Sequence, residues 1–203
     1  MVRRLVSLLS TIAFAAACTS GPPPPDDSSY IAEVTNARAV KDRFFAEGGE
    51  SPIPAAERDR LLPLPYFEVD TRYNVPAVLR LADERPVFEM PTSTGAPRRM
   101  QRVGVLEFTL DGRALSLGAF IPAESQRVEQ LFVPFADETT GTDTYEAGRY
   151  LDINPTATGL YTIDFNHAYN PYCAYNQAYE CPFPPPSNRL PVAILAGEKK
   201  PVG

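Results

Sequence analysis

A series of short apolar runs, separated by turn residues, occupies the chain from Leu64 onward and constrains its fold more than any other feature. In residues 103–110 apolar and polar side chains alternate, which is the period of a strand buried on one face. Asp111-Gly112 follows this run and leads directly into the next, residues 113–120. An Asp-Gly pair between two such runs is the strongest short-range signal for a β-hairpin. We therefore expect an antiparallel sheet.

Nine runs of this kind can be distinguished, and each has the length of an ordinary strand. They are residues 66–69, 73–81, 86–90, 103–110, 113–120, 130–136, 149–153, 160–166 and 191–196. Helix-length segments do not alternate with them, which argues against a parallel nucleotide-binding sheet. The sequence predicts a mainly β fold, an antiparallel β-sandwich or barrel-like sheet of about eight to nine strands.

One or two helices are expected before the sheet. Residues 30–46 contain no Gly or Pro and place apolar side chains at helical spacing, and Gly48-Gly49 ends the segment. Pro54 opens a second, short helical segment that reaches residue 62.

The N-terminus has the pattern of a secretory signal. Two arginines precede an uncharged apolar stretch, residues 5–17, which has signal-peptide length and is shorter than the about 20 residues that span a bilayer. Three alanines stand directly before Cys18. This arrangement resembles the lipobox of bacterial lipoproteins, and the resemblance implies cleavage before Cys18 and acylation of its thiol. The alternative is an ordinary signal peptide that is cleaved after an Ala-x-Ala sequence.

These features divide the chain into three parts. Residues 1–17 are the expected lipoprotein signal peptide, residues 18–28 the lipidated cysteine with a proline-rich tether, and residues 29–203 a single β-rich domain. Four consecutive prolines make the tether an extended polyproline segment. The protein would be anchored by palmitate and related acyl chains, face the periplasm of a bacterial cell envelope and, because Thr19 follows the cysteine, reside in the outer membrane.

Charge and composition exclude several functional classes. Lys and Arg number 19 against 25 Asp and Glu, and there is no long basic block, so nucleic acid is not an expected partner. The single His excludes a metal site built from two or three imidazoles. There is no Gly-rich phosphate loop, and we predict neither a metal nor a cofactor.

The C-terminal third carries the most specific pattern. Seven of the ten tyrosines lie between residues 145 and 179, among Asn, Asp and Pro residues. Such tyrosines either pack with tethered hydroxyl groups or form the walls of a binding site. Asp164 and Asn166 project from one face of an expected strand, and if they are buried Arg149 and Arg189 are the expected partners. Such an ion pair would either fix loops or mark a site.

Three segments of this third resemble a known family. They are TTGTDTYEAGRYLD (residues 139–152), DFNHAYNPYCAY (residues 164–175) and CPFPPPSNRLP with the later AGEK (residues 181–199). Together they are similar to domain-of-unknown-function family 1684, over about residues 38–200. The family occurs in bacterial lipoproteins and soluble bacterial proteins, and the resemblance implies no established activity. His167 stands where a basic residue is more usual, which argues against an essential catalytic role for it.

Cys173 and Cys181 are separated by seven residues in a chain expected to be exported, so a disulfide is predicted. The alternative is a thiol pair that cycles or binds metal, and the resemblance implies that soluble members share these cysteines in a reducing compartment. A zinc site from these cysteines with Asp164 and His167 fits no known spacing. No G-x-S-x-G sequence supports a serine hydrolase.

Two functions remain. The first is a ligand-binding, partner-binding or assembly module that uses the Tyr/Asn/Asp/Arg-rich C-terminal cluster to hold a small molecule or a protein. The alternative is a hydrolase-like envelope enzyme with acid–base chemistry at Asp164, Arg149 and Glu198, which would need a concave site around these groups. The missing nucleophile and cofactor motifs favour binding. The candidate binding residues are Tyr145, Arg149, Asp164, Asn166, Tyr169, Asn170, Tyr175, Asn188, Arg189, Glu198 and Lys199.

Overall fold

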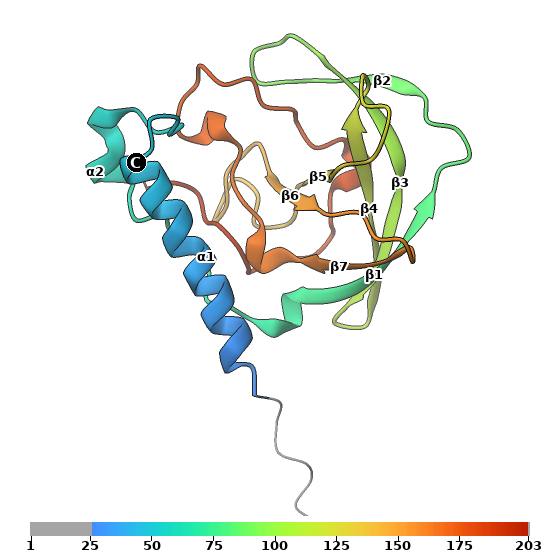
Figure 1. Ribbon diagram of the computed structural model, residues 1–203, viewed down its shortest axis with the longest axis horizontal. Helices are drawn as coiled ribbons and strands as arrows, with labels where there is room; N and C mark the ends of the chain where they lie inside the picture. The colour runs from blue at the N-terminus through green and yellow to red at the C-terminus, as the bar shows by residue number, and fades with distance from the viewer. Residues whose placement is uncertain (1–25, 203) are drawn as a thin grey trace, which may run out of the picture.

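The computed structural model describes residues 26–202 of the chain (Figure 1). The expected signal peptide, Cys18 and most of the tether lie outside the described residues. Within residues 26–202, none of the helices combines the length and the apolar character that a bilayer crossing requires.

One antiparallel sheet curls around the core (Figure 1). Its strand order is β6-β5-β4-β3-β1-β7, and β2 pairs with β3 outside this path. The strands are β1 Asn74–Leu81, β2 Val87–Met90, β3 Arg98–Leu110, β4 Arg113–Pro122, β5 Leu131–Phe135, β6 Arg149–Ile153 and β7 Leu160–Asp164. The predicted mainly β fold with a barrel-like antiparallel sheet is confirmed.

The β3–β4 hairpin turns where the sequence predicts it. Asp111 and Gly112 have positive φ angles of 48° and 77°, as a two-residue turn between twisted strands requires. Leu110 pairs with Arg113 directly across this turn. The hairpin supplies the longest ladder of the sheet and fixes the register of its centre.

Two of the nine expected runs are not strands. In residues 66–69 only Tyr66 forms an isolated bridge, with Glu198. Residues 191–196 have no ladder, because the carbonyl oxygens of Ile194 and Ala196 accept hydrogen bonds from the buried Arg149 side chain. A side chain thus satisfies backbone groups that a neighbouring strand would otherwise pair.

The core joins the inner face of the sheet to the C-terminal segment. Leu106, Leu117 and Val133 are fully buried on the sheet, and Phe165 and Ile194 of the C-terminal segment pack into the same cluster. The curled sheet is therefore filled by the chain's own C-terminal third, and this places the loops of that third beside β5 and β6.

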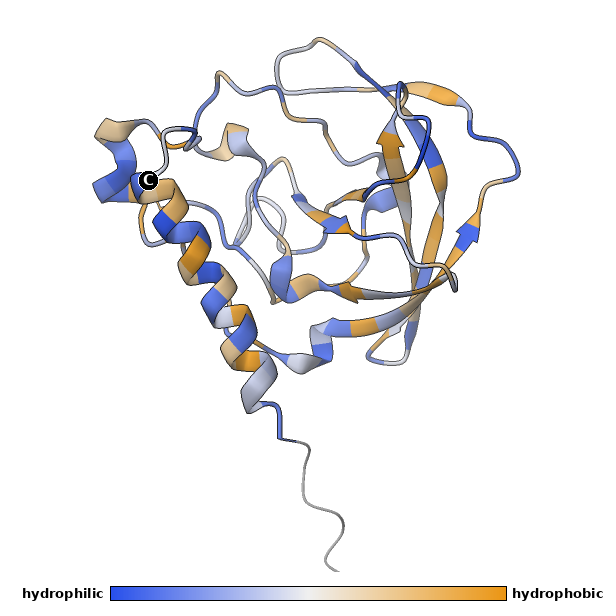
Figure 2. Cartoon of the chain, viewed as in Figure 1, coloured by the Kyte–Doolittle hydropathy of each residue, from blue (hydrophilic) through white to orange (hydrophobic). Residues whose placement is uncertain are grey.

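Two α-helices precede the sheet, as predicted: α1 Ser28–Glu47 and the short α2 Arg58–Leu61. Hydrophilic and hydrophobic residues are interspersed along α1 (Figure 2), and only Val34 and Phe45 are buried. Short 3₁₀ segments complete the described structure, at Ala55–Glu57, Thr71–Tyr73, Phe165–His167, Tyr172–Ala174 and Pro186–Asn188. Because α1 buries little apolar surface, polar contacts must supply much of its attachment.

Candidate functional site

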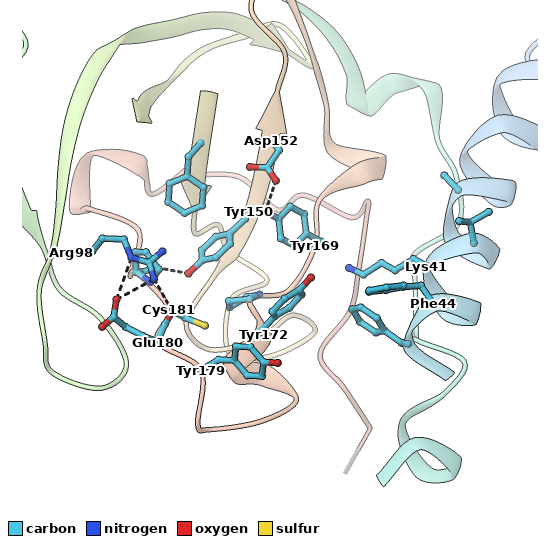
Figure 3. Close-up of a pocket in the computed structure, with 16 residues that line it drawn as sticks. Lys41, Phe44, Arg98, Tyr150, Asp152, Tyr169, Tyr172, Tyr179, Glu180 and Cys181 are labelled. Atoms are coloured by element: carbon cyan, nitrogen blue, oxygen red, sulfur yellow. Dashed lines mark hydrogen bonds and ion pairs between the residues drawn. The ribbon is translucent and has the colours of Figure 1, made fainter. Parts of the chain in front are cut away.

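A cleft of about 790 Å³ lies between α1 and one face of β6, with the C-terminal loops around it (Figure 3). The alternation of side chains along β6 creates its floor. Leu151 and Ile153 point into the core, whereas Tyr150 and Asp152 point the other way and line the cleft. Phe132 of β5 stands directly opposite Asp152 in the register and joins the same floor.

Aromatic rings form a continuous row across this floor. Phe132 and Tyr150 meet edge to face with centroids 4.7 Å apart, and Tyr150 and Tyr169 do so at 5.8 Å. The Tyr150 hydroxyl donates to the carbonyl of Pro182 at 2.5 Å, and the backbones of Tyr150 and Tyr169 form a bridge. These bonds hold the Tyr150 and Tyr169 rings in place, and their partners are backbone groups of the protein.

The walls of the cleft expose further aromatic surface. Phe44 of α1 is 45% exposed and Tyr172 is 38% exposed, although both line the cleft. Tyr172 packs edge to face on Tyr179, with ring centroids 5.3 Å apart. Large apolar side chains that stay exposed around a hollow are typical of a surface that another molecule covers.

The two cations that line the cleft are each paired with a carboxylate. Lys41 of α1 lies 2.5 Å from Glu198, which is 1% exposed. Arg98 of β3 lies 3.1 Å from Glu180 at the opposite side of the cleft. Both positive charges are therefore neutralised within the protein.

Asp152 differs from the other charged groups of the cleft. Its carboxylate accepts a hydrogen bond from the Tyr169 hydroxyl at 2.7 Å, and no Lys, Arg or His of residues 26–202 lies within 4 Å of it. Although the Asp152 side chain remains exposed, nearby protein atoms reduce its hydration and raise its pKa above the ordinary value, and the bond from Tyr169 opposes this. Reduced hydration and the Asp152 charge likewise raise the pKa of Tyr169.

Four of the predicted residues form a hydrogen-bond network next to the cleft: Asn170, Tyr175, Glu198 and Lys199. Glu198 accepts hydrogen bonds from the backbone N–H of Asn170 and the hydroxyl of Tyr175, each at 2.7 Å. The Asn170 side chain donates to the carbonyl of Lys199 at 2.7 Å. Burial and the Glu198 charge raise the pKa of Tyr175 well above its ordinary value. This network holds Glu198 in place for Lys41.

Arg149 lies in the interior and does not pair with Asp164, so that predicted pairing is wrong. The side chain is fully buried and contacts Asp137 at 2.8 Å. It also donates to the carbonyl of Ile194 at 2.9 Å and to that of Ala196. Burial lowers the pKa of Arg149, and the Asp137 charge opposes this change. The pair ties β6 to the C-terminal segment.

Asp164 has partners that the sequence did not indicate. It accepts hydrogen bonds from the hydroxyl of Tyr30 at 2.7 Å and from the backbone N–H of Asn166 at 2.9 Å. The Asn166 side chain exchanges two further bonds with the backbone of Asp70. The predicted pair of Asp164 and Asn166 therefore connects the start of α1 to the sheet.

The remaining predicted polar residues lie away from the cleft. Asn188 is fully buried and its side chain bonds the backbones of Gly118 and Pro134. Arg189 is exposed and forms a backbone bridge with Ala136, and the prediction that it pairs with Asp164 is wrong. Both residues fasten the C-terminal segment to the sheet.

The predicted disulfide is wrong, because Cys173 and Cys181 are free, buried thiols. The Cys181 sulfur instead accepts a hydrogen bond from the backbone N–H of Cys173 at 3.1 Å. The bond between the two thiols lowers the pKa of Cys173 to about 7 and raises that of Cys181. Tyr145 contacts the Cys173 sulfur at 4.0 Å, and Cys181 lines the cleft.

Sequence reasoning identified Tyr169 in the cleft but missed most of the lining. Strand alternation in residues 149–153 could have found Tyr150 and Asp152, because their neighbours Leu151 and Ile153 are apolar. No comparable signal exists for the groups that distant segments contribute. Tyr150, Tyr172 and Tyr179 belong to the tyrosine cluster that the sequence offered as possible walls of a site. The polar and aromatic lining residues that were missed are Lys41, Phe44, Phe45, Arg98, Phe132, Asp152 and Glu180.

Comparisons with known proteins give a family and a fold. The family model described as "Protein of unknown function (DUF1684)" matches residues 60–199. No curated protein matches the chain. A solution NMR structure of an uncharacterised protein from Haloarcula marismortui is 40% identical, with a TM-score of 0.67, and the match covers 84% of this chain and 94% of that one.

Proposed function

The chain belongs to the DUF1684 family of proteins of unknown function, and from this premise we propose that it is a ligand-binding module of the bacterial cell envelope. Its site is the cleft between α1 and the floor formed by β5 and β6. The ligand is a small molecule that covers the exposed aromatic rings of that cleft.

The shape and lining of the cleft carry this proposal. Its volume of about 790 Å³ falls within the about 300–1,000 Å³ of small-molecule sites. The exposed rings of Phe44 and Tyr172 line the cleft together with the aromatic row that contains Tyr150 and Tyr169 (Figure 3). Burying such rings is a large source of binding free energy.

The arrangement gives less support to an enzyme. Acid–base chemistry at Asp164, Arg149 and Glu198 requires their side chains to converge, yet the three charged groups pair with Tyr30, Asp137 and Lys41 respectively, and Arg149 reaches only the backbone carbonyl of Glu198. Asp164 and His167 line an adjoining hollow of about 420 Å³, which shares Asp152 and Tyr169 with the cleft, and neither Arg149 nor Arg189 lines that hollow. The three charges are used to hold segments together.

Attachment to the membrane is part of the proposal and is supported by the sequence of residues 1–18. An anchor at Cys18 would lead through the short tether directly into α1, which forms one wall of the cleft. Metabolic labelling with an alkyne analogue of palmitate should label the wild-type protein and not Cys18→Ser. Equal labelling of both proteins would refute the anchor.

The binding function is tested by a fragment screen on the full chain, read by thermal shift and by ligand-observed NMR. Val40 lines the cleft and is 51% exposed, so Val40→Trp should fill the cleft without disturbing the core. Leu81→Trp is the matched control, since Leu81 is 64% exposed and does not line the cleft. We expect hits that bind the wild type and Leu81→Trp but not Val40→Trp. Hits that bind all three proteins equally would place the ligand elsewhere.

A further inference from the structure

The ionic side chains of the cleft leave one charge without a partner. Lys41 and Arg98 are the cations of the lining, and they pair with Glu198 and Glu180. Asp152 has no cationic partner among residues 26–202. The cleft with its supporting Glu198 therefore has two positive and three negative groups, and the excess negative charge is at Asp152.

The Asp152 carboxylate can accept more hydrogen bonds than it receives. An ionised carboxylate has about four acceptor positions. Tyr169 fills one of them with its hydroxyl at 2.7 Å. Asp152 is exposed, and it borders the cleft as well as two smaller hollows of about 420 and 330 Å³. A donor group of a ligand has both access and room at this position.

Aromatic rings surround the same carboxylate. Phe132 is its direct neighbour across the β5–β6 ladder, Tyr150 is on the same face of β6, and Tyr169 touches it. Electron-rich ring faces attract cations within about 6 Å of the centroid. The cleft already uses this attraction, because the Lys41 ammonium lies 5.0 Å from the Tyr169 ring centroid.

An anionic ligand has no comparable position. The charge of each cation of the lining is already compensated by a carboxylate, so an anion bound there would add a second negative charge beside Glu198 or Glu180. A neutral ligand would leave Asp152 uncompensated in surroundings that already reduce its hydration.

On these grounds we infer that the ligand of the cleft carries an organic ammonium group on an apolar or aromatic body. The ammonium group binds at Asp152 among Phe132, Tyr150 and Tyr169. The apolar body extends toward Tyr172 and Phe44 of the opposite wall (Figure 3). This inference rests on the proposed function, because it assigns the ligand class of that same cleft.

Three probes with one apolar body test the inference: 4-phenylbutylamine, 4-phenylbutan-1-ol and 4-phenylbutyrate. Their affinities for the full chain are measured by titration calorimetry. We expect the amine to bind about five- to tenfold more tightly than the alcohol, and the acid to bind most weakly. Asp152→Asn should bring the amine to the affinity of the alcohol and leave the alcohol unchanged.

Glu107→Gln is the charge-matched control, because Glu107 is exposed and pairs with Arg80 away from the cleft. It should preserve the advantage of the amine. If the alcohol binds as tightly as the amine, or if Asp152→Asn keeps the difference, the ligand class is wrong while the binding function stands. If none of the three probes binds the wild type, both proposals are wrong.

Discussion

Arg149 is the residue on which the interior depends most. Charged side chains are rarely fully buried unless they are paired, and Arg149 satisfies this condition with Asp137 and the carbonyls of Ile194 and Ala196. Sequence reasoning expected Arg149 to pair with a buried carboxylate but chose Asp164 instead of Asp137. The true partner, Asp137, lies just beyond β5, and its position depends on the tertiary fold.

Arg149→Ala should therefore destabilise the protein severely. It leaves the buried Asp137 charge without compensation, for which we expect a loss of about 3–5 kcal/mol in the free energy of unfolding. The measurement is urea unfolding followed by circular dichroism. Arg80→Ala is the control, because its pair with Glu107 is exposed and should contribute at most about 1 kcal/mol. Equal losses for the two variants would contradict this account of the interior.

Gly197 positions the carboxylate that follows it in the chain. Its φ is +76°, and a Cβ atom there would lie 2.6 Å from the Ala168 carbonyl oxygen and 2.7 Å from that of Phe165. Glycine thus permits the close approach that brings Glu198 to Lys41.

Gly197→Ala should lower the free energy of unfolding by more than Gly95→Ala does. Both glycines have a positive φ, but an added Cβ at Gly95 meets nothing within 4 Å. Gly95→Ala should therefore lose only the free energy of left-handed backbone strain, about 1–2 kcal/mol. The additional loss in Gly197→Ala measures the clash of the new Cβ atom with the two carbonyl oxygens. Thermal unfolding of the two proteins gives this difference, and equal melting temperatures would show that the approach at Gly197 is not restrictive.

Among the elements, the β3–β4 hairpin was predictable because its signal is local: Asp111-Gly112 dictates the turn and the flanking alternation dictates the strands. The helix α1 was also predicted, since residues 30–46 contain no breaking residue. Its position across the cleft from β5 and β6 was not predicted. Lys41 and Glu198 are 157 residues apart in the chain, and no sequence pattern specifies contacts at that separation.

If α1 is a wall of the site, breaking it should abolish binding. Ala37→Pro removes a helical hydrogen bond in the middle of α1 and should destabilise it by about 3 kcal/mol. Ser29→Pro is the control, because a proline in the first turn of a helix is tolerated. We expect circular dichroism to show helix loss and calorimetry to show lost binding for Ala37→Pro alone. Unchanged affinity in Ala37→Pro would exclude α1 from the site.

For the whole molecule, the sequence indicated the fold class and the family but only part of the candidate site. Residues such as Asn170, Asn188 and Arg149 were selected as polar groups beside apolar runs. In the structure their side chains form hydrogen bonds that join one segment of the chain to another. The cleft is formed mainly by side chains on the opposite face, such as Tyr150 and Asp152. Tertiary packing decides which face of a short strand lies opposite a helix. Composition and residue spacing alone do not predict that packing.

Seven tyrosines with raised pKa values predict the response of the whole protein to alkaline pH. In each of seven, reduced hydration is the main cause that raises the pKa above its ordinary value. They are Tyr30, Tyr66, Tyr145, Tyr150, Tyr169, Tyr172 and Tyr175. Because the folded pKa values exceed those of the unfolded chain, this contribution to stability is complete below about pH 10 and is lost as the pH rises above it.

We therefore expect the melting temperature to fall steeply above about pH 10 and tyrosinate absorbance to appear together with unfolding. The check is a spectrophotometric titration combined with circular dichroism on the same samples. Tyrosinate absorbance that rises fully near pH 10 in a protein that stays folded would contradict the reduced hydration of these hydroxyl groups.

The central claim, that the cleft binds a ligand, is tested most directly by mapping amide chemical shifts of the nitrogen-15-labelled full chain during titration with 4-phenylbutylamine. We predict that the perturbed amides cluster in residues 37–45 of α1, residues 150–152 of β6 and residues 169–172, which line the cleft. Perturbations that cluster on another face, or none at saturating probe, would contradict the claim.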